Sequence, residues 1–208
     1  MGLASLLFKN PALFLVISVP ILYSVIAHEI AHGWVAYMFG DDTARRSGRL
    51  SLNPFKHLDP IGTLALFLVG FGWARPVPIT YSNLRSFRIG LVSVSLAGCI
   101  VNIAIATMSI SLLQFTQIRS NPLIAVILVV LARINILLGS LNLIPIPPLD
   151  GSRVLMGILP PRAQIALARL EPYGMLILLG LLFTGLLDPV IITIQNVITT
   201  IIKTILRI

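Results

Sequence analysis

Three residues near the N-terminus have the types and the spacing of a metal-hydrolase site. They belong to the pentapeptide His28-Glu29-Ile30-Ala31-His32. In a helix, positions i and i+4 lie on one face, so His28 and His32 can present imidazole nitrogens to a single divalent ion, with Glu29 beside them. No Asp, Glu, Lys or Arg occurs between Asn10 and His28. Ionisable groups in so apolar a segment are costly unless they serve a function, which favours chemistry within a membrane.

A site with two histidines lacks a third ligand, because catalytic zinc sites usually offer three protein ligands and leave a fourth position to water. The run Leu141-Asn142-Leu143-Ile144-Pro145-Ile146-Pro147-Pro148-Leu149-Asp150-Gly151 can supply it through Asp150. Its three prolines prevent a regular helix, and irregular backbone at membrane depth must be buried in protein or line a water-filled cavity. Asp150 could instead cap the helix that follows Gly151. Both interpretations are open at this point.

The composition indicates an integral membrane protein. Of 208 residues, 57% are hydrophobic and 11% are charged, whereas a soluble domain has about 25% charged residues. The net charge of +8 could suggest nucleic acid, but the basic residues are scattered between apolar segments and form no face interleaved with aromatic residues. We therefore expect the lipid bilayer as a partner and no nucleic acid. The single cysteine, Cys99, excludes an internal disulfide.

Four segments approach the roughly 20 apolar residues that a membrane span requires. They are residues 11–39, 89–117, 121–144 and 173–187, and Pro20 should kink or divide the first. The tail, residues 190–208, is expected to lie in the interface or to span only in part. The predicted fold class is all-α: a polytopic transmembrane helical bundle forming one domain over residues 1–208.

A different kind of segment separates the first two spans. The apolar run 60–74 is only about 15 residues long, which predicts a re-entrant segment rather than a span. Its flanks, residues 48–52 and 76–80, have short extended character, and proline limits such segments to sheet edges. A small membrane-associated β element is therefore expected here.

Basic residues set the predicted orientation. Seven Lys or Arg lie in residues 40–88 and three in residues 145–172, whereas the opposite side has only Lys9 and Arg119. The positive-inside rule makes the two basic segments cytoplasmic and places the N-terminus outside. Asp150 then lies on the membrane side toward which the histidine helix runs, which favours its assignment as the third ligand.

At this point the chain resembles the site-2 protease family of intramembrane zinc metalloproteases. The family's two signatures read here His28-Glu29-Ile30-Ala31-His32 and Asn142-Leu143-Ile144-Pro145 through Leu149-Asp150-Gly151. The segments 48–54, 57–62 and 72–78 are also similar to its compact bacterial and archaeal branch, which has no PDZ or CBS domain. The resemblance covers roughly residues 11–187.

The resemblance implies an enzyme that hydrolyses peptide bonds in or near transmembrane segments of other proteins, in a prokaryotic cell membrane with the site toward the cytoplasm. His28, His32 and Asp150 would bind Zn²⁺, and Glu29 would act as general base and then acid. Asn142 could stabilise the oxyanion or simply bond between helices. The predicted edge strands could hold an unwound substrate by strand addition. The oligomeric state is not implied.

Two further residues are candidates for substrate binding. Asn102 is expected to form hydrogen bonds between helices near the site. His57 could gate substrate or contact the metal, or it could form a hydrogen-bonding pair with Asp59 at the surface or the interface.

Two other functions fit the same ligands. A metal-ion or small-solute transporter would bind a passing cation near the midplane, and a non-catalytic scaffold would keep the fold and bind membrane helices. Glu29 discriminates the protease from the transporter, because a transporter needs no base next to a bound water. The intact set of His28, Glu29, His32 and Asp150 argues against the scaffold.

Overall fold

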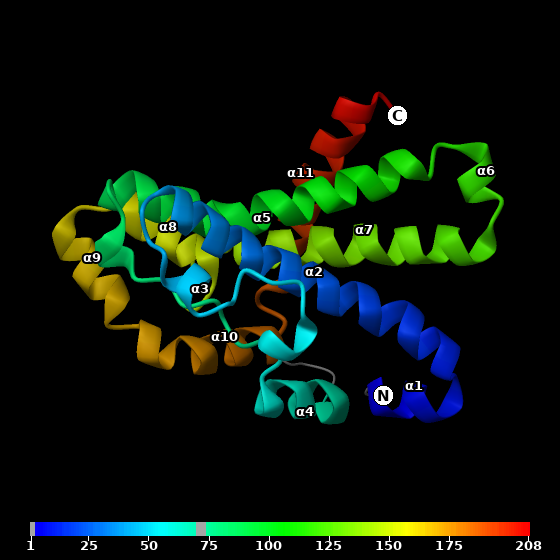
Figure 1. The fold of residues 1–208 in the computed structure, drawn as a ribbon, viewed down its shortest axis with the longest axis horizontal. Coiled ribbons are helices and arrows are strands. Elements are labelled where there is room, and N and C mark those ends of the chain that lie inside the picture. The colour runs from blue at the N-terminus through cyan, green and yellow to red at the C-terminus, as the bar shows by residue number, and fades with distance from the viewer. Residues whose placement is uncertain (1–2, 70–73) are drawn as a thin grey trace.

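The computed structural model describes residues 3–69 and 74–208 as a helical bundle (Figure 1). Three long helices form its centre: α2 (Pro11–Met38), α5 (Phe87–Leu112) and α7 (Pro122–Asn142). α5 and α7 lie side by side, and α2 packs against both. Five helical segments of the described residues are long and apolar enough to cross a membrane: Pro11–Met38, Phe87–Leu112, Pro122–Asn142, Pro161–Phe183 and Asp188–Leu206. The prediction of an all-α polytopic bundle is confirmed.

Shorter elements connect and cover this centre. The remaining α-helices are α1 (Leu3–Lys9), α3 (Thr43–Arg46), α4 (Pro60–Val69), α6 (Thr116–Arg119), α8 (Asp150–Ile158), α9 (Pro161–Ala168), α10 (Gly174–Phe183) and α11 (Asp188–Leu206). In the described parts of the chain, three short 3₁₀ turns join them: η1 (Pro54–Lys56), η2 (Tyr81–Asn83) and η3 (Glu171–Tyr173).

Two of the long helices begin at an asparagine followed by proline. The Asn10 side chain accepts a hydrogen bond from the Leu13 amide at 3.0 Å, and Asn121 accepts from the amides of Leu123 and Ile124. Asparagine is a favoured N-cap, and proline suits the first helical position because its missing N–H would have no partner there. Pro20 lies inside α2, which continues through it as one helix rather than dividing into two.

The C-terminal helix is a fifth segment of spanning length, whereas the sequence of residues 190–208 predicts an interfacial or partial element. Ile198 and Ile202 of α11 are buried against Ala106 of α5, and Ile136 of α7 packs against the same cluster. Figure 1 shows α11 running across the α5 and α7 pair. Its 19 residues correspond to about 28 Å of helix, so length does not prevent it from spanning.

The predicted β element was wrong. The described residues contain no strand, and the two flanks of α4 meet only at an isolated antiparallel bridge between Leu58 and Ala74. On the second flank, an arginine side chain forms hydrogen bonds with the backbone carbonyls that a neighbouring strand would otherwise bond. Arg49 donates from Nη2 to the carbonyls of Arg75 and Pro76, at 2.6 and 3.1 Å, and Pro76 has no N–H to offer.

The first flank is held in the same way. Lys56 Nζ donates to the Gly48 carbonyl at 2.9 Å, and His57 Nε2 donates to the Ser51 carbonyl at 2.8 Å. The first flank is a turn followed by bends, with Gly48 at φ 62°, so neither flank pairs as a strand beyond the single bridge.

The predicted re-entrant segment begins as α4. This helix has 10 residues and is about 15 Å long, half of the roughly 30 Å hydrocarbon core. Residues 70–73, which belong to the same apolar run, lie outside the described residues. Re-entry into the membrane stays a prediction.

Candidate active site

The three predicted metal ligands meet at one point, although α2 and α8 are far apart in the sequence. His28 Nε2 lies 3.0 Å from Asp150 Oδ2, and His32 Nε2 lies 3.1 Å from the same oxygen. The two Nε2 atoms are 3.0 Å apart. Both histidines are buried, and Asp150 is half-buried. The structure thus brings together a triangle of two imidazole nitrogens and one carboxylate oxygen.

The opposite ring nitrogens determine which atoms carry protons. His32 Nδ1 lies 2.6 Å from the Val94 carbonyl oxygen, which can only accept, so Nδ1 carries the proton. His28 Nδ1 lies 2.5 Å from Asn102 Oδ1, another acceptor. In both neutral rings Nε2 is then left with its lone pair. Two lone pairs and a carboxylate oxygen converge with no proton to share, which is the arrangement that a cation completes.

A chain of buried amides fixes the orientation of Asn102. Asn135 Nδ2 donates to the Leu131 carbonyl at 2.8 Å and to Ser24 Oγ at 2.7 Å, so Asn135 Oδ1 is left as an acceptor. Asn102 Nδ2 donates to that oxygen at 2.7 Å, and Asn102 Oδ1 therefore faces His28. This series of hydrogen bonds links α2, α5 and α7. It begins and ends on α2, because Ser24 lies one turn before the ligand His28 on that helix.

Two glycines allow the close approach of these elements. A Cβ at Gly98 of α5 would lie 2.4 to 2.6 Å from three atoms of the His28 ring. A Cβ at Gly151 would lie 2.5 Å from the carbonyl oxygens of Leu143 and Ile144. Glycine at these positions therefore lets α5 pack on His28 and lets the chain turn back after α7.

Asp150 is not a helix cap in this structure. It is the first residue of α8, its N-cap residue is Leu149, and no side chain caps the helix. Its carboxylate contacts the two imidazoles instead. The alternative assignment of Asp150 as an N-cap is therefore not supported.

The donor set fits zinc. A tetrahedral Zn²⁺ with ligands at about 2.0–2.2 Å separates neighbouring donor atoms by about 3.3–3.5 Å. The three donors lie 3.0 to 3.1 Å apart, so an outward shift of a few tenths of an ångström would admit the ion. Two imidazoles and a carboxylate also match the ligand types that zinc prefers.

Glu29 and Asn142 line the same cavity as the three ligands, which has a volume of about 270 Å³. Glu29 Oε2 accepts a hydrogen bond from the Val77 amide at 2.8 Å, and its Oε1 has no partner among the described residues. Asn142 ends α7 and donates from Nδ2 to the Leu138 carbonyl at 3.1 Å, which leaves its second amide hydrogen free. Each side chain is therefore fixed by one hydrogen bond and keeps a second polar group, Oε1 of Glu29 or an amide hydrogen of Asn142, for a molecule in the cavity.

The two residues predicted to bind substrate lie elsewhere. Asn102 is fully buried behind His28 and does not line the cavity, a position that favours orienting the ligand over contacting substrate. His57 is also fully buried and bonds the Ser51 carbonyl. Asp59 does not pair with it, because Asp59 Oδ1 accepts from the Gly62 amide at 2.7 Å.

Several site residues were not assigned from the sequence. Tyr81 and Arg153 form one wall of the cavity, with Arg153 Nη1 donating to the Tyr81 hydroxyl at 2.5 Å. Burial raises the pKa of Tyr81 above its ordinary value despite the nearby Arg153 charge, so the phenol keeps its proton. Ser95 lines the cavity and its buried hydroxyl has no partner among the described residues. Ser and Tyr are too common for sequence spacing to single them out.

An anchor at the end of α2 holds the cavity wall. Asp41 is fully buried and accepts hydrogen bonds from Thr43 Oγ1 at 2.5 Å, from the Thr80 amide at 2.8 Å and from Asn83 Nδ2 at 3.0 Å. Burial alone would raise the pKa of Asp41, but these donors lower it below its ordinary value. The charged carboxylate thereby ties α2 to the segment that follows Val77.

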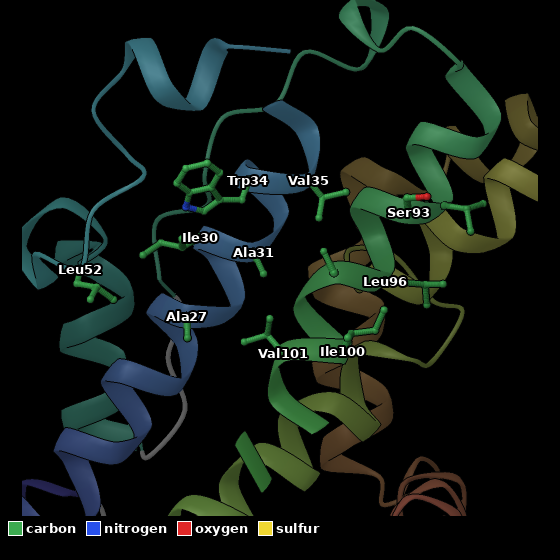
Figure 2. A pocket seen from close by; sticks show the side chains of 12 residues that line it. Ala27, Ile30, Ala31, Trp34, Val35, Leu52, Ser93, Leu96, Ile100 and Val101 are labelled. Carbon is green, nitrogen blue, oxygen red and sulfur yellow. The ribbon is translucent and has the colours of Figure 1, made fainter. Parts of the chain in front are cut away.

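A larger cavity lies outside the site. It is a groove of about 670 Å³ between α2 and α5, whose lining side chains are shown in Figure 2. The lining is apolar apart from Ser93 and the indole of Trp34, and it includes none of the predicted catalytic or metal residues. The groove therefore supplies no metal ligand.

Comparisons with known proteins give the family. A model of peptidase family M50 matches residues 63–185, which include Asn142 and Asp150 but not the histidine pair. The chain is 38% identical over 175 residues to "Putative zinc metalloprotease YwhC" of Bacillus subtilis, covering 81% of this chain and 80% of that protein.

More distant relatives agree. "Putative zinc metalloprotease Rip2" of Mycolicibacterium smegmatis is 34% identical over 80% of this chain and 66% of its own length. "Zinc metalloprotease MJ0392" of Methanocaldococcus jannaschii is 28% identical over 74% of this chain and 37% of its own length. No solved structure matches the chain. The family match and these relatives confirm the resemblance seen in the sequence: the chain belongs to peptidase family M50, the site-2 protease family.

Proposed function

We propose that this protein is an intramembrane zinc endopeptidase that hydrolyses peptide bonds in or near transmembrane segments of other proteins. The observation that carries the proposal is the convergence of two imidazole lone pairs and one carboxylate oxygen in a cavity that also contains Glu29. The histidine pair lies outside the family match, whereas Asp150 lies inside it, so the geometry adds two ligands that the match does not cover. The names of the relatives indicate the same chemistry.

His28, His32 and Asp150 would hold the ion. Zinc, when bound, would supply a Lewis acid and a water that loses its proton near pH 7 rather than near 15.7. The Val94 carbonyl and Asn102 keep each Nε2 free for the metal, and such partners of ligating histidines typically affect metal affinity by 10- to 100-fold.

Glu29 is the proposed general base. Its Oε1 is free to take a proton from the attacking water and to return it to the leaving amine. The Val77 amide holds Oε2 and so fixes the carboxylate without blocking it. Asn142 is proposed to donate its free amide hydrogen to the carbonyl oxygen as negative charge develops there.

The size of the cavity constrains the substrate. An intact helix with its side chains is about 10–12 Å across, which is too wide for about 270 Å³. We propose that the substrate helix unwinds locally so that one extended stretch enters. The excess of Lys and Arg in residues 40–88 and 145–172 supports a cytoplasmic orientation of this cavity, in a cell membrane.

A transporter is the less favoured alternative. A passing ion needs ligands but not a base, and Glu29 lines the cavity with one carboxylate oxygen unengaged. A non-catalytic scaffold is disfavoured because the three proposed metal ligands and the proposed base, Glu29, all lie at one cavity.

The test is cleavage of a panel of single-span peptides by the purified protein, with wild type beside Glu29→Gln. The matched control is Glu171→Gln, because Glu171 is an exposed glutamate of η3 outside the cavity. We expect the Glu29 variant to retain zinc and lose cleavage, and the Glu171 variant to resemble wild type. Cleavage that survives in Glu29→Gln, or zinc-dependent ion flux without cleavage in wild type, would reject the proposal.

A further inference from the structure

A second polar cavity lies next to the active site and has a strongly basic lining. This basic pocket has a volume of about 530 Å³ and is lined by the three cations Arg49, Lys56 and Arg75, together with Ser47, Phe55 and two prolines. None of the described residues that line it is acidic. An opening with three positive charges and no carboxylate has the chemistry of an anion site.

The three charges are not neutralised by the protein. In the parts of the chain that the structure describes, the ion pairs are those of Asp150 with the histidines and of Arg46 with Asp42, and none includes Arg49, Lys56 or Arg75. Lys56 Nζ contacts a neutral acceptor, the Gly48 carbonyl. None of the three cations is therefore held in a direct ion pair in the described residues, although the Glu29 charge acts on Arg49 from the neighbouring cavity.

Arg49 is the fixed part of the pocket. Only 8% of it is exposed, and its Nη2 donates to the carbonyls of Arg75 and Pro76. Its Nε and Nη1 have no partner among the described residues, and Nε is buried. Burial and the neighbouring Arg75 charge lower the pKa of Arg49, and the Glu29 charge opposes them only in part. A buried guanidinium with unused donors is costly unless an acceptor reaches it.

We propose that the basic pocket binds the phosphate of an anionic phospholipid headgroup. A guanidinium matches the geometry of phosphate oxygens, and Lys56 and Arg75 add two charges at the rim. Clusters of Lys and Arg at the cytoplasmic membrane surface recognise anionic headgroups in this way. The orientation proposed above places the pocket at that surface.

The surroundings favour a lipid over free phosphate or an acidic peptide. Phe55, in the pocket lining, is 84% exposed, and Leu52, Ile61 and Leu64 nearby in the sequence are 64%, 69% and 57% exposed. Exposed aromatic and aliphatic side chains beside a basic site fit the boundary between headgroups and acyl chains. A ligand with both a phosphate and acyl chains satisfies both parts of this surface.

The pocket shares a wall with the active site. Pro76 lines both cavities. Arg49 donates to the carbonyls of Arg75 and Pro76, and the peptide group that begins with the Pro76 carbonyl ends with the Val77 N–H that donates to Glu29. A headgroup bound to Arg49 would steady this wall. That consequence rests on the proposed function, whereas the binding itself does not.

The experiment measures lipid binding rather than cleavage. The full chain, purified in neutral detergent, is titrated with phosphatidylglycerol or with phosphatidylcholine of the same acyl chains, and bound lipid is counted by native mass spectrometry. The test variant is Lys56→Gln/Arg75→Gln, which removes two exposed charges. It also removes the Lys56 bond to the Gly48 carbonyl, but it leaves the bonds from Arg49 to the carbonyls of residues 75 and 76 in place. The control is Arg162→Gln/Arg169→Gln, which removes two exposed charges outside the pocket.

We expect wild type and control to prefer phosphatidylglycerol. Each cation near an anionic surface contributes about fivefold, so the test variant should bind about 25-fold more weakly. Equal loss in test and control variants would overturn the proposal. Displacement of the lipid by millimolar inorganic phosphate would overturn it in favour of a free anion, and capture of an acidic peptide without lipid preference would overturn it in favour of a protein ligand. None of these readouts depends on zinc or on cleavage.

Discussion

Asn102 offers the sharpest test of how the helices position the metal site. Its Oδ1 accepts from His28 Nδ1 at 2.5 Å, and its Nδ2 donates to Asn135. Replacing it with alanine removes the acceptor that keeps Nε2 of His28 unprotonated and aimed at the metal. Partners of this kind are worth 10- to 100-fold in metal affinity, which corresponds to about 1.4–2.7 kcal/mol. We expect Asn102→Ala to weaken zinc binding by that factor.

The assay is competition for zinc against a chelator of known affinity, with the purified protein. Asn102→Asp keeps an acceptor toward His28 but loses the amide donated to Asn135, so it should bind zinc within a few-fold of wild type. The matched control is Ser109→Ala, because Ser109 is buried on the same helix and bonds only its own backbone, at Ile105. Thermal unfolding of all variants separates metal affinity from stability.

Two outcomes would contradict a positioning role of Asn102. If Asn102→Ala bound zinc as tightly as Ser109→Ala, the link from Asn102 to His28 would not orient the ligand. If Asn102→Asp lost zinc as severely as Asn102→Ala, the acceptor would not be the feature that matters.

The remaining predictions concern packing, pH and metal removal. Gly98→Ala should abolish zinc binding because its Cβ would overlap the His28 ring, whereas Gly180→Ala, with no neighbouring atom within 4 Å, should leave zinc content unchanged and stabilise its helix by about 0.5–1 kcal/mol in thermal unfolding. Asp41→Asn should destabilise the protein by about 1–3 kcal/mol at neutral pH. Because the pKa of Asp41 is lowered in the folded state, the extra free energy of unfolding of wild type over Asp41→Asn should be complete above the unfolded pKa and should be lost on acidification below about pH 4. A difference between the two proteins that stays constant with pH would contradict this. A chelator should lower the unfolding temperature of wild type, and zinc at 100 times its Kd should then raise the free energy of unfolding by about 2.7 kcal/mol. An Asp150→Asn variant that responds to zinc as wild type does would contradict the assignment of Asp150 as a ligand.

The chemistry of the site could be read from the sequence because helix periodicity and proline are local signals. The spacing of His28 and His32 places both on one face, and the prolines before Asp150 indicate where the chain leaves the helix. The resemblance to a family then linked the two segments. Positioning contacts were not predictable, because the Val94 carbonyl and the Val77 amide are backbone groups that every residue carries.

The predicted β element at residues 48–52 and 76–80 was wrong for a reason that the sequence does not contain. Their composition permitted edge strands, but the choice between strand pairing and side-chain contacts depends on which long side chain reaches the backbone. Arg49 reaches across 26 residues of sequence to the Arg75 carbonyl, and no local pattern encodes that distance. The pairing of Ser24 with Asn135 between α2 and α7 is of the same kind.

The most direct test of the central claim is X-ray absorption spectroscopy at the zinc edge of the purified protein, with metal content measured in parallel. The account predicts one zinc per chain, with imidazole nitrogens and oxygens at about 2.0–2.2 Å and the loss of zinc in His28→Ala and Asp150→Ala. A sulfur ligand at about 2.3 Å, which could come only from Cys99 or a methionine, or a chain that binds no zinc, would contradict it.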